Sequence, residues 1–191
     1  MQEKLLFFFI NKGKISKDDL DVYEYCFEML FSTLFNTCLL IIGSLVTKRY
    51  YETIIFSIAF IIIRRCIGGY HAKTHIGCIS ILTTMFVTMV LLLNINYKIL
   101  NYISICLAPI CLIMISIFAP VGHPNNPLDD YKKEQMNAIA IFVSALYCLI
   151  IILSYFAFTK SNIAILITIP LVFSTISMVI GHYVYKNVIY V

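Results

Sequence analysis

The chain has 191 residues, of which 61% are hydrophobic and only 13% are charged, and its formal net charge is +4 at neutral pH. A soluble domain carries about 45–50% apolar and about 25% charged residues, so this composition excludes an ordinary water-soluble core and predicts a membrane protein. The modest positive charge, gathered in a few loops, suits an anionic membrane face or an acidic peptide, and no nucleic-acid partner is expected.

The first 28 residues are basic and amphipathic. The apolar run LLFFFI is too short to be a span, and the polar residues after it do not resemble a signal-peptide cleavage site. Beyond it, Leu20, Tyr23, Phe27 and Leu30 lie along one stripe of a helix whose other positions include acidic residues. Residues 1–28 are therefore predicted to form an interfacial segment at the membrane surface.

Six apolar runs follow, most of them close to the roughly 20 residues that a bilayer crossing requires. The fold class is predicted to be all-α, a polytopic membrane helix bundle forming a single domain over residues 1–191. Pro109 lies inside the fourth run, where a kink is expected, and the polar stretch 123–137 is expected to be a loop. The predicted spans are 29–46, 50–63, 76–95, 102–121, 138–158 and 163–180.

The orientation follows from the basic residues, because Lys and Arg near span ends are retained in the cytoplasm. Six spans with a cytoplasmic N-terminus place ten basic residues inside and four outside. The inside set is Lys4, Lys12, Lys14, Lys17, Arg64, Arg65, Lys73, Lys132, Lys133 and Lys186, and the outside set is Lys48, Arg49, Lys98 and Lys160. Both termini are therefore predicted to be cytoplasmic, and so is the polar segment RRCIGGYHAKTHIGC at residues 64–78.

That segment contains the best candidate nucleophile. The chain has seven cysteines, an odd number mostly inside apolar runs, which indicates free thiols used as small hydrophobes. Cys78 differs because it lies near the expected start of the third span, where helix amides and the helix dipole favour a thiolate. A reducing cytosol would also keep this thiol available.

A cysteine nucleophile needs a base, and two histidines are within reach in the sequence. His75 precedes Cys78 by three residues and would share a helix face with it. His71 precedes Cys78 by seven residues, about 10.5 Å of rise on a straight helix, so it can pair with Cys78 only if the chain bends. Local geometry slightly favours His75. The segment contains no carboxylate, so a Cys/His pair is expected rather than a triad.

Less specific interpretations apply to the same residues. A histidine in a basic membrane-edge loop usually contacts solvent or headgroups, a cysteine such as Cys66 usually packs, and Gly68 with Gly69 could simply stop a helix. A small transporter or a non-catalytic membrane scaffold would also account for six spans. The absence of a carboxylate from every predicted span core argues against an ion-coupled carrier.

Two stretches of the sequence resemble the AgrB family of membrane-embedded cysteine endopeptidases in Gram-positive quorum sensing. The first is RRCIGGYH at residues 64–71 with Cys78 seven residues later. The second is APVGHPNNPL at residues 119–128, which is similar to a loop after that family's fourth span and is followed by Lys132 and Lys133. Length, basic N-terminal segment and hydropathy agree with the family over essentially the whole chain.

The resemblance implies that His71 and Cys78 form the catalytic pair, in place of the pairing with His75 that local geometry favours. Gly69 matches the family glycine before the histidine. Arg64 is the preferred match for the functional arginine, giving transition-state or structural support, although Arg65 is adjacent to it. No cofactor and no metal are implied.

The substrate implied by the resemblance is an AgrD-like propeptide with an acidic C-terminal tail. The enzyme cysteine would release the tail as it forms an acyl-enzyme thioester, and a cysteine or serine of the peptide would then close a thiolactone or lactone ring. A cationic cradle for the tail is expected from Arg65, Lys73, Lys132 and Lys133. The expected location is the plasma membrane of a Gram-positive bacterium, in contact with lipid, and a homodimer is a reasonable expectation.

Overall fold

The computed structural model describes residues 20–69, 75–121, 129–157 and 162–189, and these ranges are almost entirely helical. The six helices are α2 (Leu20–Thr47), α3 (Tyr50–Ile67), α4 (His75–Leu92), α5 (Tyr97–Phe118), α6 (Asp130–Ala157) and α7 (Ile163–Ile189). The predicted all-α bundle is confirmed. Residues 1–19 of the predicted interfacial segment lie outside the described residues, and residues 20–28 continue without a break into the first predicted span.

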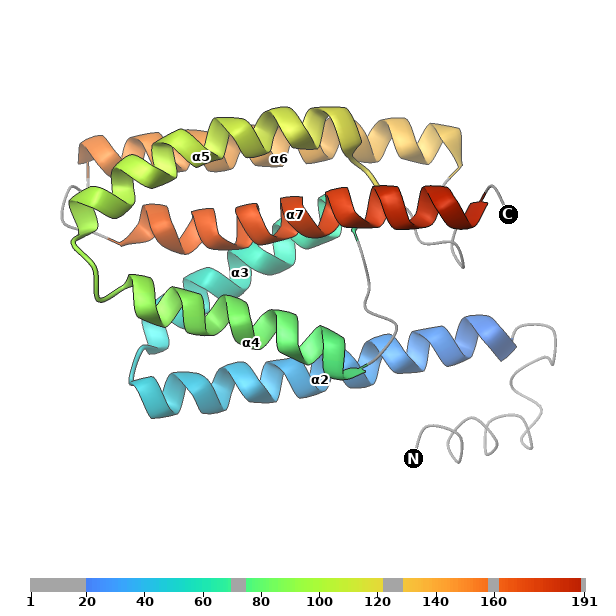
Figure 1. Cartoon of the computed structure of the whole chain (residues 1–191), viewed down its shortest axis with the longest axis horizontal. Helices are drawn as coiled ribbons and strands as arrows, with labels where there is room; N and C mark the ends of the chain where they lie inside the picture. The colour runs from blue at the N-terminus through green and yellow to red at the C-terminus, as the bar shows by residue number, and fades with distance from the viewer. Residues whose placement is uncertain (1–19, 70–74, 122–128, 158–161, 190–191) are drawn as a thin grey trace.

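The helices divide into a four-helix body and a pair beside it (Figure 1). Helices α3, α5, α6 and α7 pack together and share a core that includes Ile63, Ile115, Ile151 and Leu171. Helices α2 and α4 pack against each other, and α4 leans on α7. A second apolar cluster joins α4 to the body through Met85, Phe86 and Met89, all in the later half of that helix.

Successive helices run in opposite directions, so the chain turns alternately at two ends of the bundle (Figure 1). We call the end with the α2–α3, α4–α5 and α6–α7 connections the Arg49 end. The other end, where α3, α5 and α7 finish and α2, α4 and α6 begin, is the Arg64 end. Among the described side chains, those predicted to face outside (Lys48, Arg49, Lys98) lie at the Arg49 end, and those predicted to face the cytoplasm (Arg64, Arg65, Lys132, Lys133) lie at the Arg64 end.

Within the described part of the chain, four helices are long and apolar enough to cross a membrane, over Leu30–Thr47, Tyr97–Phe118, Tyr131–Phe156 and Ile163–Tyr185. Helices α3 and α4 have 18 residues each, which at 1.5 Å per residue is about 27 Å, slightly less than the ~30 Å hydrocarbon core. The outward faces of the bundle are rich in exposed Ile, Leu and Phe. Because lipid is as apolar as these side chains, such an exterior fits a multi-pass membrane protein.

Several helices extend beyond the predicted spans. Helix α6 begins at Asp130, not near residue 138, so the second half of the stretch expected to be a loop is helical. Its first turn closes with a bond from the Lys133 amide to the Asp129 carbonyl, 2.8 Å. Hydropathy marks the part of a helix that lipid surrounds, whereas Lys, Glu, Gln and Met are good helix formers in water and continue the helix past it.

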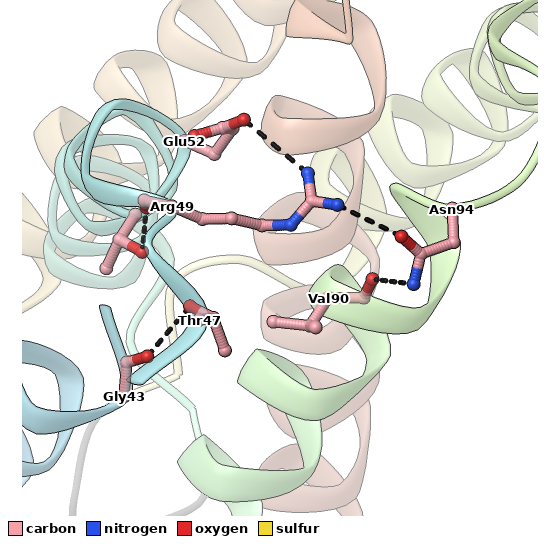
Figure 2. Close-up of polar contacts among 7 residues, drawn as sticks. Gly43, Thr47, Arg49, Glu52, Val90 and Asn94 are labelled. Atoms are coloured by element: carbon pink, nitrogen blue, oxygen red, sulfur yellow. Dashed lines mark hydrogen bonds and ion pairs between the residues drawn. The ribbon is translucent and has the colours of Figure 1, made fainter. Parts of the chain in front are cut away.

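A polar cluster joins two turns at the Arg49 end (Figure 2). The Arg49 guanidinium donates to Asn94 Oδ1 at 3.0 Å and lies 3.6 Å from the Glu52 carboxylate. Asn94 in turn donates to the Val90 carbonyl. These contacts tie the α2–α3 turn to the α4–α5 turn, close to where the second apolar cluster holds α4 against the body.

The cysteines whose side chains are described are free thiols, as the sequence predicts. Cys111 and Cys148 are buried inside the four-helix body, where they pack as small hydrophobes. Cys38 and Cys106 lie on the apolar exterior, and Cys66 is half-buried at the end of α3.

Candidate active site

The exit of α3 is held against the exit of α5. Helix α3 stops at Gly68, whose amide closes the last turn onto the Arg64 carbonyl at 3.2 Å and whose φ of +68° is the left-handed conformation that favours glycine. The Val121 amide donates to the Ile67 carbonyl at 3.1 Å, and Gly68 forms a β-bridge with Val121. A Cβ on Gly68 would collide with the Val121 carbonyl oxygen. This close backbone approach explains why glycine is required here.

The bridge brings together parts of the two stretches that resemble the AgrB family. The first stretch ends α3, and the second begins with Ala119 and a cis Ala119–Pro120 peptide bond directly after α5. Each stretch can be recognised in the sequence by itself, but the sequence does not show that the two are in contact. Residues 122–128 of the second stretch lie outside the described residues.

Gly69 is held by a different set of neighbours. Its φ is +124°, which again only glycine adopts readily. A Cβ at this position would stand 2.7 Å from Arg64 Nη1 and 3.1 Å from the Met178 backbone nitrogen on α7. The side of Gly69 on which a side chain would stand is therefore occupied by the Arg64 guanidinium and the backbone of α7.

Arg64 and Arg65 occupy different environments. Arg64 is half-buried, and its Nη1 donates to Ser177 Oγ on α7 at 2.7 Å. Arg65, one residue later, is exposed. The resemblance to the AgrB family favours Arg64 for the supporting role but leaves Arg65 as an alternative. The assignment of a supporting role to Arg64 and of substrate binding to Arg65 stays a prediction.

The two proposed catalytic residues lie on either side of the start of α4. His71 and Lys73 lie outside the described residues. Helix α4 begins at His75, so Cys78 is its fourth residue, near the helix N-terminus that the sequence predicts for it. Its side chain, like that of His75, is not described. Residues 70–74, between Gly69 and the start of α4, lie outside the described residues, so the bend expected between His71 and Cys78 stays a prediction.

The basic residues proposed for substrate binding gather at the Arg64 end. Lys132 and Lys133 are exposed in the first turn of α6, and Arg65 is exposed in the last turn of α3. Acidic side chains share the α6 turn, since Glu134 follows Lys133 directly. The α3–α4 and α5–α6 connections, which are predicted to be cytoplasmic, therefore leave and re-enter the bundle at the same end (Figure 1).

Sequence reasoning missed the contribution of α7. Ser177 and Met178 contact the segment that the resemblance identifies, yet they lie inside an apolar run. His182 lies one turn beyond Met178 with its ring 5.2 Å from that of Phe118, and it too was not singled out. The only signal available was the spacing of Ser174 and Ser177, which places two hydroxyls on one helix face.

Taken together, the bundle is a multi-pass helical membrane protein in which α3 ends in a glycine-dependent turn beside Arg64, and the next helix along the chain, α4, carries Cys78 in its first turn. The family model for accessory gene regulator B matches residues 3–181. The chain therefore belongs to the AgrB family, which is associated with peptide processing in quorum sensing and acts with AgrD-like propeptides.

Individual relatives agree with this assignment. An AgrB-like protein of Clostridium beijerinckii is 28% identical over 173 residues, covering 86% of this chain and 80% of its own length. The protein FsrB of Enterococcus faecalis is 28% identical over 183 residues, covering 87% and 73% of the two chains. A further AgrB-like protein, from Clostridium perfringens, is 24% identical over 149 residues, covering 74% and 70%. No solved structure matches the chain.

Proposed function

We propose that this protein is a membrane-embedded cysteine endopeptidase that removes the acidic C-terminal tail of an AgrD-like propeptide and allows the remainder to cyclise. The observation that carries the proposal is the anchoring of the turn before α4. The Val121 amide is hydrogen-bonded to the Ile67 carbonyl, Gly68 is bridged to Val121, and the side of Gly69 where a Cβ would stand is occupied by Arg64 and α7, immediately before the segment that contains His71. Family membership adds the peptide-processing context.

The reaction needs Cys78 as nucleophile and His71 as base. His71 takes the proton from the Cys78 thiol, and the thiolate attacks the carbonyl carbon of the peptide bond before the tail. The C–N bond then breaks, His71 protonates the departing amine, and the acyl group stays on Cys78 as a thioester. The peptide's own thiol or hydroxyl attacks this thioester, closes the ring and releases Cys78. These steps require no oxidant, reductant or metal.

Arg64 and Gly69 support this reaction from the α3 side. The tetrahedral intermediate carries a negative oxygen, for which the amides at the start of α4 or the Arg64 guanidinium are the proposed donors. Since Nη1 of Arg64 is bound to Ser177 and contacts Gly69, the residue also fixes the direction in which the chain leaves α3. Structural support and charge stabilisation are therefore combined in one side chain.

The acidic tail would bind the basic residues Arg65, Lys73, Lys132 and Lys133. Arg65, Lys132 and Lys133 are exposed at the Arg64 end, and each cation adds to a positive potential that attracts carboxylates. We further propose that this end faces the cytoplasm of a Gram-positive cell, because basic residues near span ends are retained there. A homodimer in the lipid bilayer is also proposed, because the protein is small and its exterior is rich in exposed Ile, Leu and Phe.

The decisive experiment incubates the purified protein, reconstituted in lipid, with synthetic propeptide and follows the products by mass spectrometry. Cys78→Ala and His71→Ala are expected to abolish tail release while His75→Ala retains most turnover. Cleavage by the Cys78→Ala variant would remove the nucleophile assignment. Loss of turnover in His75→Ala with activity in His71→Ala would instead restore the pairing within the first turn of α4. A transporter or scaffold would yield neither a free tail nor a cyclic product.

A further inference from the structure

Ser177 holds one side of the Arg64 guanidinium from a different helix. Its hydroxyl oxygen accepts the hydrogen bond from Arg64 Nη1 at 2.7 Å, and the same nitrogen occupies the space that a Cβ on Gly69 would need. An arginine side chain has several rotatable bonds, so it keeps one position only when its N–H groups are held by acceptors. Ser177 supplies such an acceptor, fixed on the rigid backbone of α7.

The neighbouring backbone of α7 reinforces this placement. Met178 is fully buried, and its backbone nitrogen and Cα form the other wall around Gly69. Consecutive residues of α7 thus contact both the guanidinium and the glycine that the guanidinium covers. Any shift of Arg64 away from Ser177 would change the space in which Gly69 is enclosed.

We propose that Ser177 is a positioning residue for the peptidase reaction, acting through Arg64 on the turn that leads to His71. It touches neither the substrate nor the reacting atoms. It holds the Arg64 guanidinium over Gly69, and this contact sets the path of the chain from α3 towards the proposed base. The inference rests on the proposed function, because the consequence of the contact is stated for that reaction.

The same helix provides a matched control. Ser174 lies one turn before Ser177 and is 1% exposed, and its hydroxyl has no hydrogen-bond partner within the described residues. Replacing either serine by alanine removes the same oxygen atom from the same helix. Only the Ser177→Ala change removes a hydrogen bond to a charged group, so the two variants separate that bond from the general effect of losing a hydroxyl from α7.

The first measurement is the kinetics of tail release from synthetic propeptide by protein in lipid. Ser177→Ala is expected to lower kcat about tenfold with KM within about twofold, since a hydrogen bond to a charged group is lost away from the substrate. Ser177→Thr keeps a hydroxyl and is expected to stay within about threefold of the unchanged protein. Ser174→Ala is expected to match the unchanged protein. Equal losses in both alanine variants, or no loss in Ser177→Ala, would overturn the proposal.

A second measurement separates positioning from stability and tests the proposed pair independently of turnover. The rate at which iodoacetamide alkylates Cys78 at pH 7, followed by mass spectrometry of the Cys78 peptide, reports the thiolate directly. His71→Ala and Ser177→Ala are both expected to slow it, and Ser177→Ala is expected to add nothing in the His71→Ala background. If His71→Ala leaves the rate unchanged, the proposed pair fails. If His71→Ala slows alkylation and Ser177→Ala does not, the pair stands and the role of Ser177 is refuted.

Discussion

The two ends of the bundle each hold an arginine that binds a polar side chain on another part of the chain, and the two arginines have different surroundings. At the Arg49 end the side chain is half-buried, and its guanidinium meets Asn94 and Glu52, which both lie at turns on the surface (Figure 2). At the Arg64 end the guanidinium is half-buried, bound to Ser177 and pressed against Gly69. Arg49 links two surface turns. Arg64 instead packs beside Gly69, where there is no room for a Cβ.

This difference follows from what each arginine contacts. An exposed ion pair gains little because water and salt screen it, so the Arg49 cluster contributes at most about 1 kcal/mol. The bond between Arg64 and Ser177 is partly buried and joins two helices, and a hydrogen bond to a charged group contributes more than a neutral one. We therefore expect the Arg64 end to tolerate far fewer substitutions than the Arg49 end.

The largest effect is expected from Gly68→Ala. Alanine at φ +68° costs about 1–2 kcal/mol, and the collision with the Val121 carbonyl adds a comparable amount, so the free energy of unfolding in detergent should fall by about 3 kcal/mol. Gly43→Ala is the control near the Arg49 end. The atoms nearest to a Cβ there belong to the Phe86 side chain and not to backbone, and Gly43 lies within a helix, where alanine is the better helix former. Similar losses in the two variants would contradict the importance of the Gly68–Val121 contact.

A smaller effect separates the two arginines themselves. Arg64→Ala is expected to lower the free energy of unfolding by about 2 kcal/mol and to reduce tail release strongly. Arg49→Ala is expected to lower it by less than about 1 kcal/mol and to leave tail release unchanged. The free energy of unfolding of both variants is measured by thermal or denaturant unfolding in the same detergent. If Arg49→Ala lowered the free energy of unfolding and the rate of tail release as much as Arg64→Ala, the polar cluster at the Arg49 end would also support the site.

The smallest effect concerns the exposed charges. Reversing Lys132 and Lys133 to Glu should raise KM for the propeptide about tenfold at low salt with little change in kcat, and the effect should shrink as salt is added. Lys98→Glu at the Arg49 end serves as the control and should change neither constant. An unchanged KM in the Lys132 and Lys133 variant would remove both lysines from the substrate site.

The sequence predicts the class of fold well because lipid imposes a long-range signal on composition. Apolar runs of nearly constant length, with basic residues between them, indicate a helical bundle and the end to which each basic residue belongs. Helix boundaries are less accurate, as Asp130 at the start of α6 shows, because helices continue beyond the lipid in residues that favour them.

The arrangement of the candidate site could not be predicted in the same way. The hydrogen bond between Arg64 and Ser177 joins residues 113 positions apart, and no periodicity in the chain encodes it. The bridge between Gly68 and Val121 likewise depends on how α3 and α5 are placed against each other. Resemblance to the family singled out Arg64 and Gly69, but it could not show that α7 encloses them. The pairing of His71 with Cys78 stays a prediction.

The bridge at Gly68 also limits how the protein can change during evolution. The atom that a Cβ at position 68 would strike is the carbonyl oxygen of residue 121, and every amino acid carries that oxygen. No replacement of Val121 can therefore make room for a larger residue opposite it. A lineage that lost Gly68 could not recover by a compensating substitution at the contact, and would have to move the end of α5 as a whole.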